Sequence, residues 1–235
     1  NNNFLNKINK TIEIRIDKIN SNKTESLNDF YLLGKIKKGK FVKILSKSEF
    51  SPGNYLDISL LENNSTGYKD LEIFSDIPKF LLSDYNFFKG IENGKLTFNS
   101  SFNKKESQSN LVIEDFRVKN APAFAKLLAL ADFGGISDLL SGDGISFDRL
   151  EIDLSDNNSV LNINEIFAVG PSISILMEGY QESSSGLISL KGTMVPAKEL
   201  NKLISKIPVL GDILIPKEAG EGLFGVSFKI KGLPG

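Results

Sequence analysis

Hydrophobic and polar residues alternate along most of this chain, starting close to its first residues. Isoleucines at positions 12, 14 and 16 are separated by charged residues, which is the period-2 pattern of a strand with one buried face. Similar segments at 30–37, 41–45 and 55–61 are separated by Lys38-Gly39-Lys40 and Ser51-Pro52-Gly53-Asn54, two sequences typical of tight turns. The pattern predicts a β-meander over residues 1–70.

From about residue 71 onward, strands alternate with three amphipathic stretches that each begin near a proline. These prolines are Pro78, Pro122 and Pro196, and proline is favoured in the first turn of a helix. Strands are predicted at 95–102, 111–119, 145–154, 159–169, 172–180, 186–193 and 223–230. The predicted fold class is mostly β, a β-rich α+β protein with three short amphipathic helical segments. A soft boundary near 62–75 separates residues 1–70 from 71–235, or the two form one continuous domain.

Two strands change phase along their length. Between 111 and 118 the apolar residues move from odd to even positions, and between 145 and 154 the same slip occurs. A β-bulge produces such a slip and bends the sheet. The alternative is that one strand ends there and another begins.

The three helical stretches carry apolar faces that something must cover. The chain's own sheet, a lipid acyl chain, a membrane surface or another protein each fit this requirement. The residues expected to face a membrane or partner are Phe124, Leu127, Leu128, Phe133, Ile136, Leu200, Leu203, Ile213 and Leu214.

Composition narrows the chemistry that the chain supports. The sequence contains no cysteine and no histidine, which removes disulfides, thiolate nucleophiles and the side chain most used for proton transfer near neutral pH. The formal net charge of −1 argues against binding nucleic acid through a basic surface. No apolar run reaches the roughly 18 residues of a membrane span. We expect no enzyme activity, no catalytic or metal-binding residues and no cofactor.

Two charged clusters can be interpreted either as solvent-exposed surface or as a functional site. Lysines at 35, 37, 38, 40, 43 and 47 indicate the solvated face of a hairpin rather than a contact with anionic lipid or nucleic acid. Glu151 and Asp153 share a strand face opposite Leu150 and Ile152, so we expect them in solvent rather than in a glycosidase pair or calcium site.

Long collinear segments resemble a known family. Residues 116–128 (FRVKNAPAFAKLL), 139–150 (LLSGDGISFDRL), 192–197, 207–214 and 222–226 are similar to the C-terminal region of AsmA-like proteins, in particular their YhdP-like branch. Residues 75–98 show a weaker likeness. The similar segments are turns and apolar stretches rather than catalytic signatures. They therefore support membership of the family more strongly than any particular function.

This resemblance implies a periplasmic module of the bacterial cell envelope. Such proteins are anchored in the inner membrane by an N-terminal helix, which lies outside this chain. Their body is an elongated, curved antiparallel sheet whose apolar groove accommodates phospholipid acyl chains between the inner and outer membranes. The first residue is asparagine rather than methionine, and we expect residues 1–70 to continue a longer β-structure upstream.

Alternation then supplies the residues expected to line the groove. They are Leu96, Phe98, Ile145, Phe147, Leu161, Ile163, Ile173, Ile175, Met177, Val226, Phe228 and Ile230. The leading hypothesis is a non-enzymatic module for phospholipid transport or accommodation. The alternative is an envelope assembly or scaffold domain that binds a protein through a sheet edge or its helix faces. A hydrolase built on Asp and Glu is the least favoured interpretation.

Overall fold

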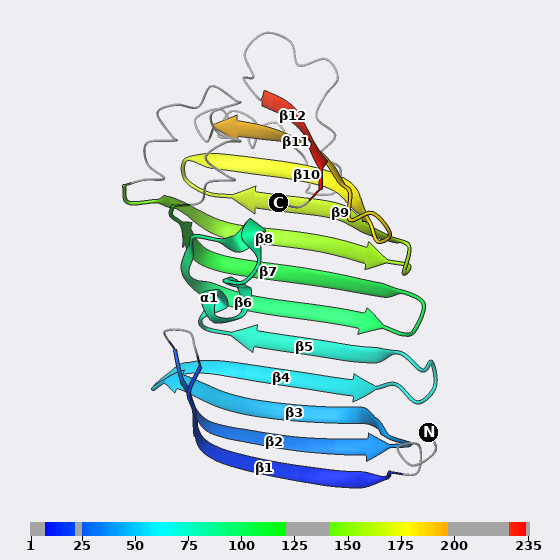
Figure 1. Cartoon of the computed structure of the whole chain (residues 1–235). Helices are drawn as coiled ribbons and strands as arrows, with labels where there is room; N and C mark the ends of the chain where they lie inside the picture. The colour runs from blue at the N-terminus through cyan, green and yellow to red at the C-terminus, as the bar shows by residue number, and fades with distance from the viewer. Residues whose placement is uncertain (1–7, 22–24, 121–141, 197–225, 234–235) are drawn as a thin grey trace.

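Twelve antiparallel strands lie side by side in chain order (Figure 1). The computed structural model describes residues 8–21, 25–120, 142–196 and 226–233. The first five strands are β1 (Lys10–Ile19), β2 (Leu27–Lys37), β3 (Lys40–Ser51), β4 (Asn54–Glu62) and β5 (Lys69–Ser75). The others are β6 (Ile91–Phe102), β7 (Ser107–Val118), β8 (Ile145–Asp156), β9 (Val160–Val169), β10 (Ile173–Glu182), β11 (Ile188–Pro196) and β12 (Val226–Gly232). The mostly β, antiparallel prediction is confirmed.

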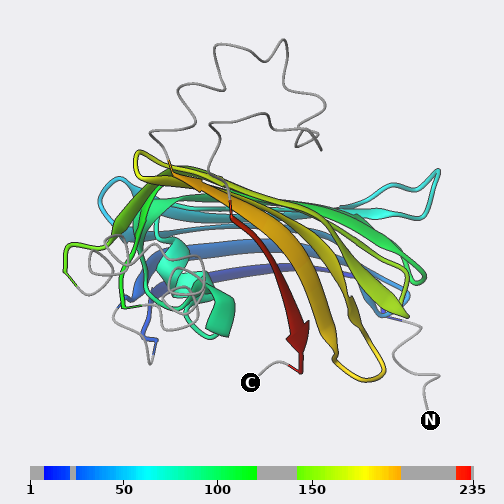
Figure 2. The same cartoon turned by 90° about the horizontal axis from the view of Figure 1, so that it is seen from above.

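The sheet stays open and curls (Figure 2). The short helix α1 (Pro78–Leu82) and the 3-10 turn η2 (Asn86–Phe88) connect β5 to β6 and lie inside the curve. Eleven spacings of about 4.8 Å make the sheet roughly 50 Å wide across its strands. The concave side is therefore a long trough that α1 covers at one place.

The prediction of three helical segments is not confirmed, because one short α-helix is present among the described residues. It begins at Pro78 as expected, with Pro in its first turn, but it ends after five residues. The predicted helical stretch around Pro122 lies outside the described residues, and so do residues 197–225, which include the stretch predicted after Pro196. Pro196 itself closes a strand, paired with Ile173, where its missing N–H is tolerated.

Backbone conformation explains the tight turns that the sequence predicted. Lys38 and Gly39 both have positive φ, at 48° and 73°, which is the two-residue hairpin turn whose twist matches the flanking strands. Gly53 has φ of 84° after a proline, as a type II turn requires. Both turns hold neighbouring strands in antiparallel pairs.

The predicted boundary near residues 62–75 falls within continuous pairing, since β5 pairs with β4 on one side and with β6 on the other. Buried apolar residues form two clusters, one around Phe50 and Leu56 and a larger one over β6 to β11. Ile73 and Leu81 pack against both clusters, so the two cores touch beneath α1.

The phase slips lie inside continuous strands, so the interpretation in which one strand ends and another begins is wrong. Ile113 and Phe116 are both buried, as are Phe147 and Leu150. Asp115 has φ of 53°, which turns the chain by one residue. The β7–β8 register is the same on both sides, because the two strands slip together rather than one bulging against the other.

Gly94 extends this bend into β6. It lies between Lys95 and Asn93, which pair with Glu114 and Phe116 on either side of Asp115, and its φ is 90°. A Cβ at this position would lie 2.7 Å from the carbonyl oxygen of Glu114. We call the aligned positions Gly94, Asp115 and Asp148 the crease, where three adjacent strands bend together.

Candidate functional site: an apolar trough

The concave face is apolar from one edge of the sheet to the other. Successive strand pairs define a middle row that crosses all twelve strands and in which only Ser46 and Gly192 are not large apolar residues. The middle row is Ile14, Leu32, Ser46, Ile58, Ile73, Phe98, Leu111, Ile152, Ile166, Met177, Gly192 and Phe228.

Two further rows run parallel to the middle row on the same face. The inner row, nearer to α1, is Ser48, Leu56, Ser75, Leu96, Ile113, Leu150, Ala168, Ile175, Met194 and Val226. The outer row is Ile12, Gly34, Ile44, Leu60, Leu71, Ser100, Ser109, Leu154, Ile163, Gly179, Leu190 and Ile230. Apart from a few serines and glycines, the three rows on the inward side of the sheet are apolar.

Burial decreases across the three rows with distance from α1. In the inner row Ile113 and Met194 are fully buried. In the middle row Phe98 and Phe228 are only partly buried, and Ile14 is 39% exposed. Leu154 and Ile163 of the outer row are also partly buried. The apolar surface is therefore least covered along the side away from α1.

Aromatic contacts fix α1 against the sheet. The ring of Phe80 meets that of Phe50 edge-on, with centroids 5.0 Å apart. Leu82 belongs to the main core cluster, and Phe88 packs against that cluster. The helix therefore covers the trough at the end of β5 and the start of β6.

All twelve residues predicted to line a groove lie on this concave side. The inner, middle and outer rows include Leu96, Ile175, Val226, Phe98, Met177, Phe228, Ile163 and Ile230. Ile145, Phe147 and Ile173 belong to the buried core cluster. Leu161 precedes Ile163 by two residues and therefore lies on the same face of β9. The residues predicted to face a membrane or partner, at 124–136 and 200–214, lie outside the described residues.

Sequence reasoning missed that the first five strands belong to the same trough. Ile14, Leu32, Ile58 and Ile73 occupy the middle row beside the predicted lining residues. The signal was present in the alternation of these segments. What the alternation lacks is the pairing that places β5 beside β6.

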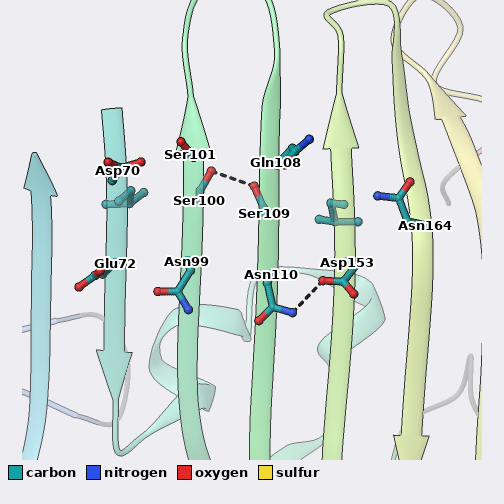
Figure 3. A pocket seen from close by; sticks show the side chains of 12 residues that line it. Asp70, Glu72, Asn99, Ser100, Ser101, Gln108, Ser109, Asn110, Asp153 and Asn164 are labelled. Carbon is teal, nitrogen blue, oxygen red and sulfur yellow. Dashed lines mark hydrogen bonds between the residues drawn. The ribbon is translucent and has the colours of Figure 1, made fainter. Parts of the chain in front are cut away.

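The convex face is polar where the concave face is apolar. One residue further along the strands, Ser59, Glu72, Asn99, Asn110, Asp153 and Glu165 form an adjacent polar row. Four of these side chains line a shallow depression of about 720 Å³ (Figure 3). Glu151 and Asp153 lie on this face, opposite the core, as the sequence predicts.

Hydrogen bonds organise the carboxylates of this polar face. Asn110 donates to Glu151 at 3.0 Å and to Asp153 at 2.7 Å, and Arg149 contacts Glu114 and Glu151, each at 2.9 Å. Partial burial alone would raise the pKa of Glu151, but hydrogen bonds from Arg149 and Asn110 outweigh it and lower the pKa. Partial burial, with Asp153 and Glu151 nearby, raises the pKa of Glu165.

The described residues contain neither a candidate metal cluster nor a candidate membrane-spanning helix. No group of three or more Asp and Glu side chains there is placed to hold a metal ion. No helix in the same part of the chain has the length and apolar character needed to cross a membrane.

Comparison with known proteins leaves the family open. No family model, no curated protein and no solved structure matches this chain. The resemblance to AsmA-like proteins therefore stays a prediction from the sequence motifs.

Proposed function

We propose that the trough holds the acyl chains of phospholipids, and that the protein is a non-enzymatic module for phospholipid transport or accommodation in the bacterial envelope. The observation that carries the proposal is the apolar middle row, which continues across every strand of an open sheet. An apolar surface of this extent needs an apolar cover.

The open shape of the sheet supports a lipid trough over a core packed between two layers. Ordinary antiparallel sheets bury one face against a second layer. Here the cover supplied by the described residues is α1 and η2, which connect two of the twelve strands. Acyl chains, unlike a polar ligand, gain by burial against this surface without needing a hydrogen-bond partner, at about 0.8 kcal/mol per buried CH₂.

The proposed setting follows from the family resemblance. An AsmA-like body that reaches from the inner toward the outer membrane needs a groove that continues along its length. A row crossing twelve strands has this form. The periplasmic location and the inner-membrane anchor are part of the same proposal.

Native mass spectrometry of the chain purified in mild detergent tests this function. We expect bound phospholipid on the wild-type protein and about tenfold less on a double variant, Ile163→Asn with Phe228→Asn, since both residues are partly buried in the trough. Leu61→Asn is the matched control, because Leu61 is 45% exposed and neighbours Leu60 of the outer row, so it points to the opposite face. A wild-type chain that binds no phospholipid would contradict the proposal.

A protein-binding scaffold is the second candidate, and the strand edges favour it. β1 and β12 each pair on one side only among the described residues. Ile14 and Ile16 of β1 are 39% and 41% exposed, and an exposed apolar edge strand is a template for β-augmentation. Capture of a partner strand along β1 by a lipid-free protein would favour this candidate over the trough.

A further inference from the structure

The two rims of the trough differ in construction. One rim, which we call the turn rim, consists of the short connections 38–39, 63–68, 103–106, 157–159 and 183–187. The other rim carries the remaining connections, of which 52–53 and 170–172 are short and the one from β5 to β6 holds α1. Of the three rows, the outer row lies closest to the turn rim. One more concave row, which includes Glu62, Lys69, Phe102, Asp156 and Leu161, separates it from these short turns.

Basic side chains gather at two places on the turn rim. Lys38 and Lys40 belong to the β2–β3 turn, and Lys104 and Lys105 to the β6–β7 turn. The β4–β5 turn between them, residues 63–68, is uncharged. Four strand spacings separate the two basic turns, which is roughly 19 Å.

These lysines are available for an anion. None of the four forms an ion pair with any described residue. The carboxylate of Glu106, next to Lys105, instead accepts a hydrogen bond from the Tyr68 hydroxyl. In the following turn Asn158 donates to the backbone oxygens of Lys104 and Lys105 at 2.9 and 2.8 Å, which holds that turn's backbone and leaves both ammonium groups unused.

We infer that the turn rim receives the phosphate headgroups of anionic phospholipids while their acyl chains enter the trough across the outer row. This inference rests on the proposed function and specifies its ligand. A phosphate diester attracts ammonium groups, and the outer row, which is apolar except for its two serines and two glycines, begins roughly 10 Å from the turns. Charge at the turn rim and apolar surface beside it match the two ends of one amphiphile. The helix α1 covers part of the opposite side, at β5 and β6, so the turn rim is the side of entry.

The test measures uptake of fluorescent-chain lipids from vesicles of phosphatidylglycerol or of phosphatidylcholine. The variant K38Q/K40Q/K104Q/K105Q removes four charges from the turn rim. The control K79Q/K89Q/K95Q/K119Q removes the same number elsewhere. We expect the wild type and the control to favour phosphatidylglycerol by about tenfold, and the rim variant to lose that preference while still taking up phosphatidylcholine. Raising the salt concentration should weaken the preference in the wild type as well.

The outcomes separate this inference from the proposed function. A wild type that takes up both lipids equally, or two variants that lose the preference equally, would overturn the assignment of headgroups to the turn rim while leaving the trough intact. A wild type that takes up neither lipid would overturn the proposed function itself. Circular dichroism of both variants checks that they fold alike.

Discussion

Single carboxylates on the convex face respond to their surroundings in opposite ways. Glu151 accepts hydrogen bonds from Arg149 and Asn110, whereas Glu165 is placed near Asp153 and Glu151 without such donors among the causes of its shift. The pKa of Glu151 is therefore lowered and that of Glu165 is raised. A lowered pKa means that the ionised carboxylate stabilises the fold, and a raised pKa means that it destabilises the fold.

These directions predict opposite pH effects for two substitutions. Glu165→Gln should raise the urea midpoint at about pH 7, because the cost of ionising Glu165 in the folded state is present above its raised pKa; the gain should vanish at about pH 4, below the ordinary pKa of Glu. Glu151→Gln should lower the midpoint at about pH 7, with the loss shrinking as pH falls through the range where the native carboxylate is protonated.

Urea unfolding of both variants and the wild type at the two pH values provides the measurement. The paired design controls for the loss of one negative charge, which is common to the two variants. Shifts of the same sign at neutral pH would show that net charge, rather than the local partners of each carboxylate, governs the effect.

At the scale of elements, the crease decides how β6, β7 and β8 bend. Three strands bend at aligned positions, which are Gly94 in β6, Asp115 in β7 and Asp148 in β8. Glycine is needed in β6 because a Cβ at position 94 would also lie 2.8 Å from Cβ of Phe116, in addition to its contact with the Glu114 carbonyl. The bend keeps Phe116 and Phe147 stacked inside the trough, with ring centroids 5.2 Å apart.

Gly94→Ala should therefore destabilise the protein by about 2–4 kcal/mol, the sum of backbone strain and steric overlap. Gly53→Ala is the matched control, since Gly53 has a similar φ of 84° but no atom lies within 4 Å of its added Cβ. It should cost only about 1 kcal/mol of backbone strain. Urea unfolding measures both. Equal losses would mean that the crease is not sterically tight.

The local pattern of apolar and polar residues predicted most of the strands and turns. It did not predict which residues pair across neighbouring strands. Alternation placed the strands within a few residues. Lys38-Gly39 and Pro52-Gly53 predicted their turns because glycine favours the positive φ that each turn needs and proline fixes the φ of the residue before Gly53. The slip near residue 115 was visible as well. The alternation could not show the cause of the slip, because the slip depends on Gly94 and Asp148 in the neighbouring strands.

Pro196 is the last residue of β11, and the helical stretch predicted to follow it lies outside the described residues. Proline starts a helix readily, but it also fits the last residue of a strand, and the sequence around position 196 allows both. The fully buried side chain of Met194 extends the strand alternation up to that point. Tertiary burial of this methionine, which local pattern does not report, favours the strand.

At the scale of the whole molecule, the trough results from the sequential order of the strands and from the open edges of the sheet. Every strand pairs with its neighbours in sequence, so each apolar face adds to the same side. A sheet of twelve twisted strands curls, and the described strands stay open rather than closing into a ring. The sequence predicted which residues are apolar and inward, but the resemblance, not the alternation, suggested the curved groove.

The central claim is that lipid acyl chains contact the concave face and not the convex one. Site-specific photo-crosslinking in living cells tests it most directly, with a photoreactive amino acid placed at Phe98 or Ile163 on the trough side and at Asn99 or Leu61 on the opposite face. The proposed function predicts phospholipid adducts, identified by mass spectrometry, at the two trough positions and little or none at the two convex positions. Adducts of equal yield on both faces, or protein adducts alone at Phe98 and Ile163, would contradict it.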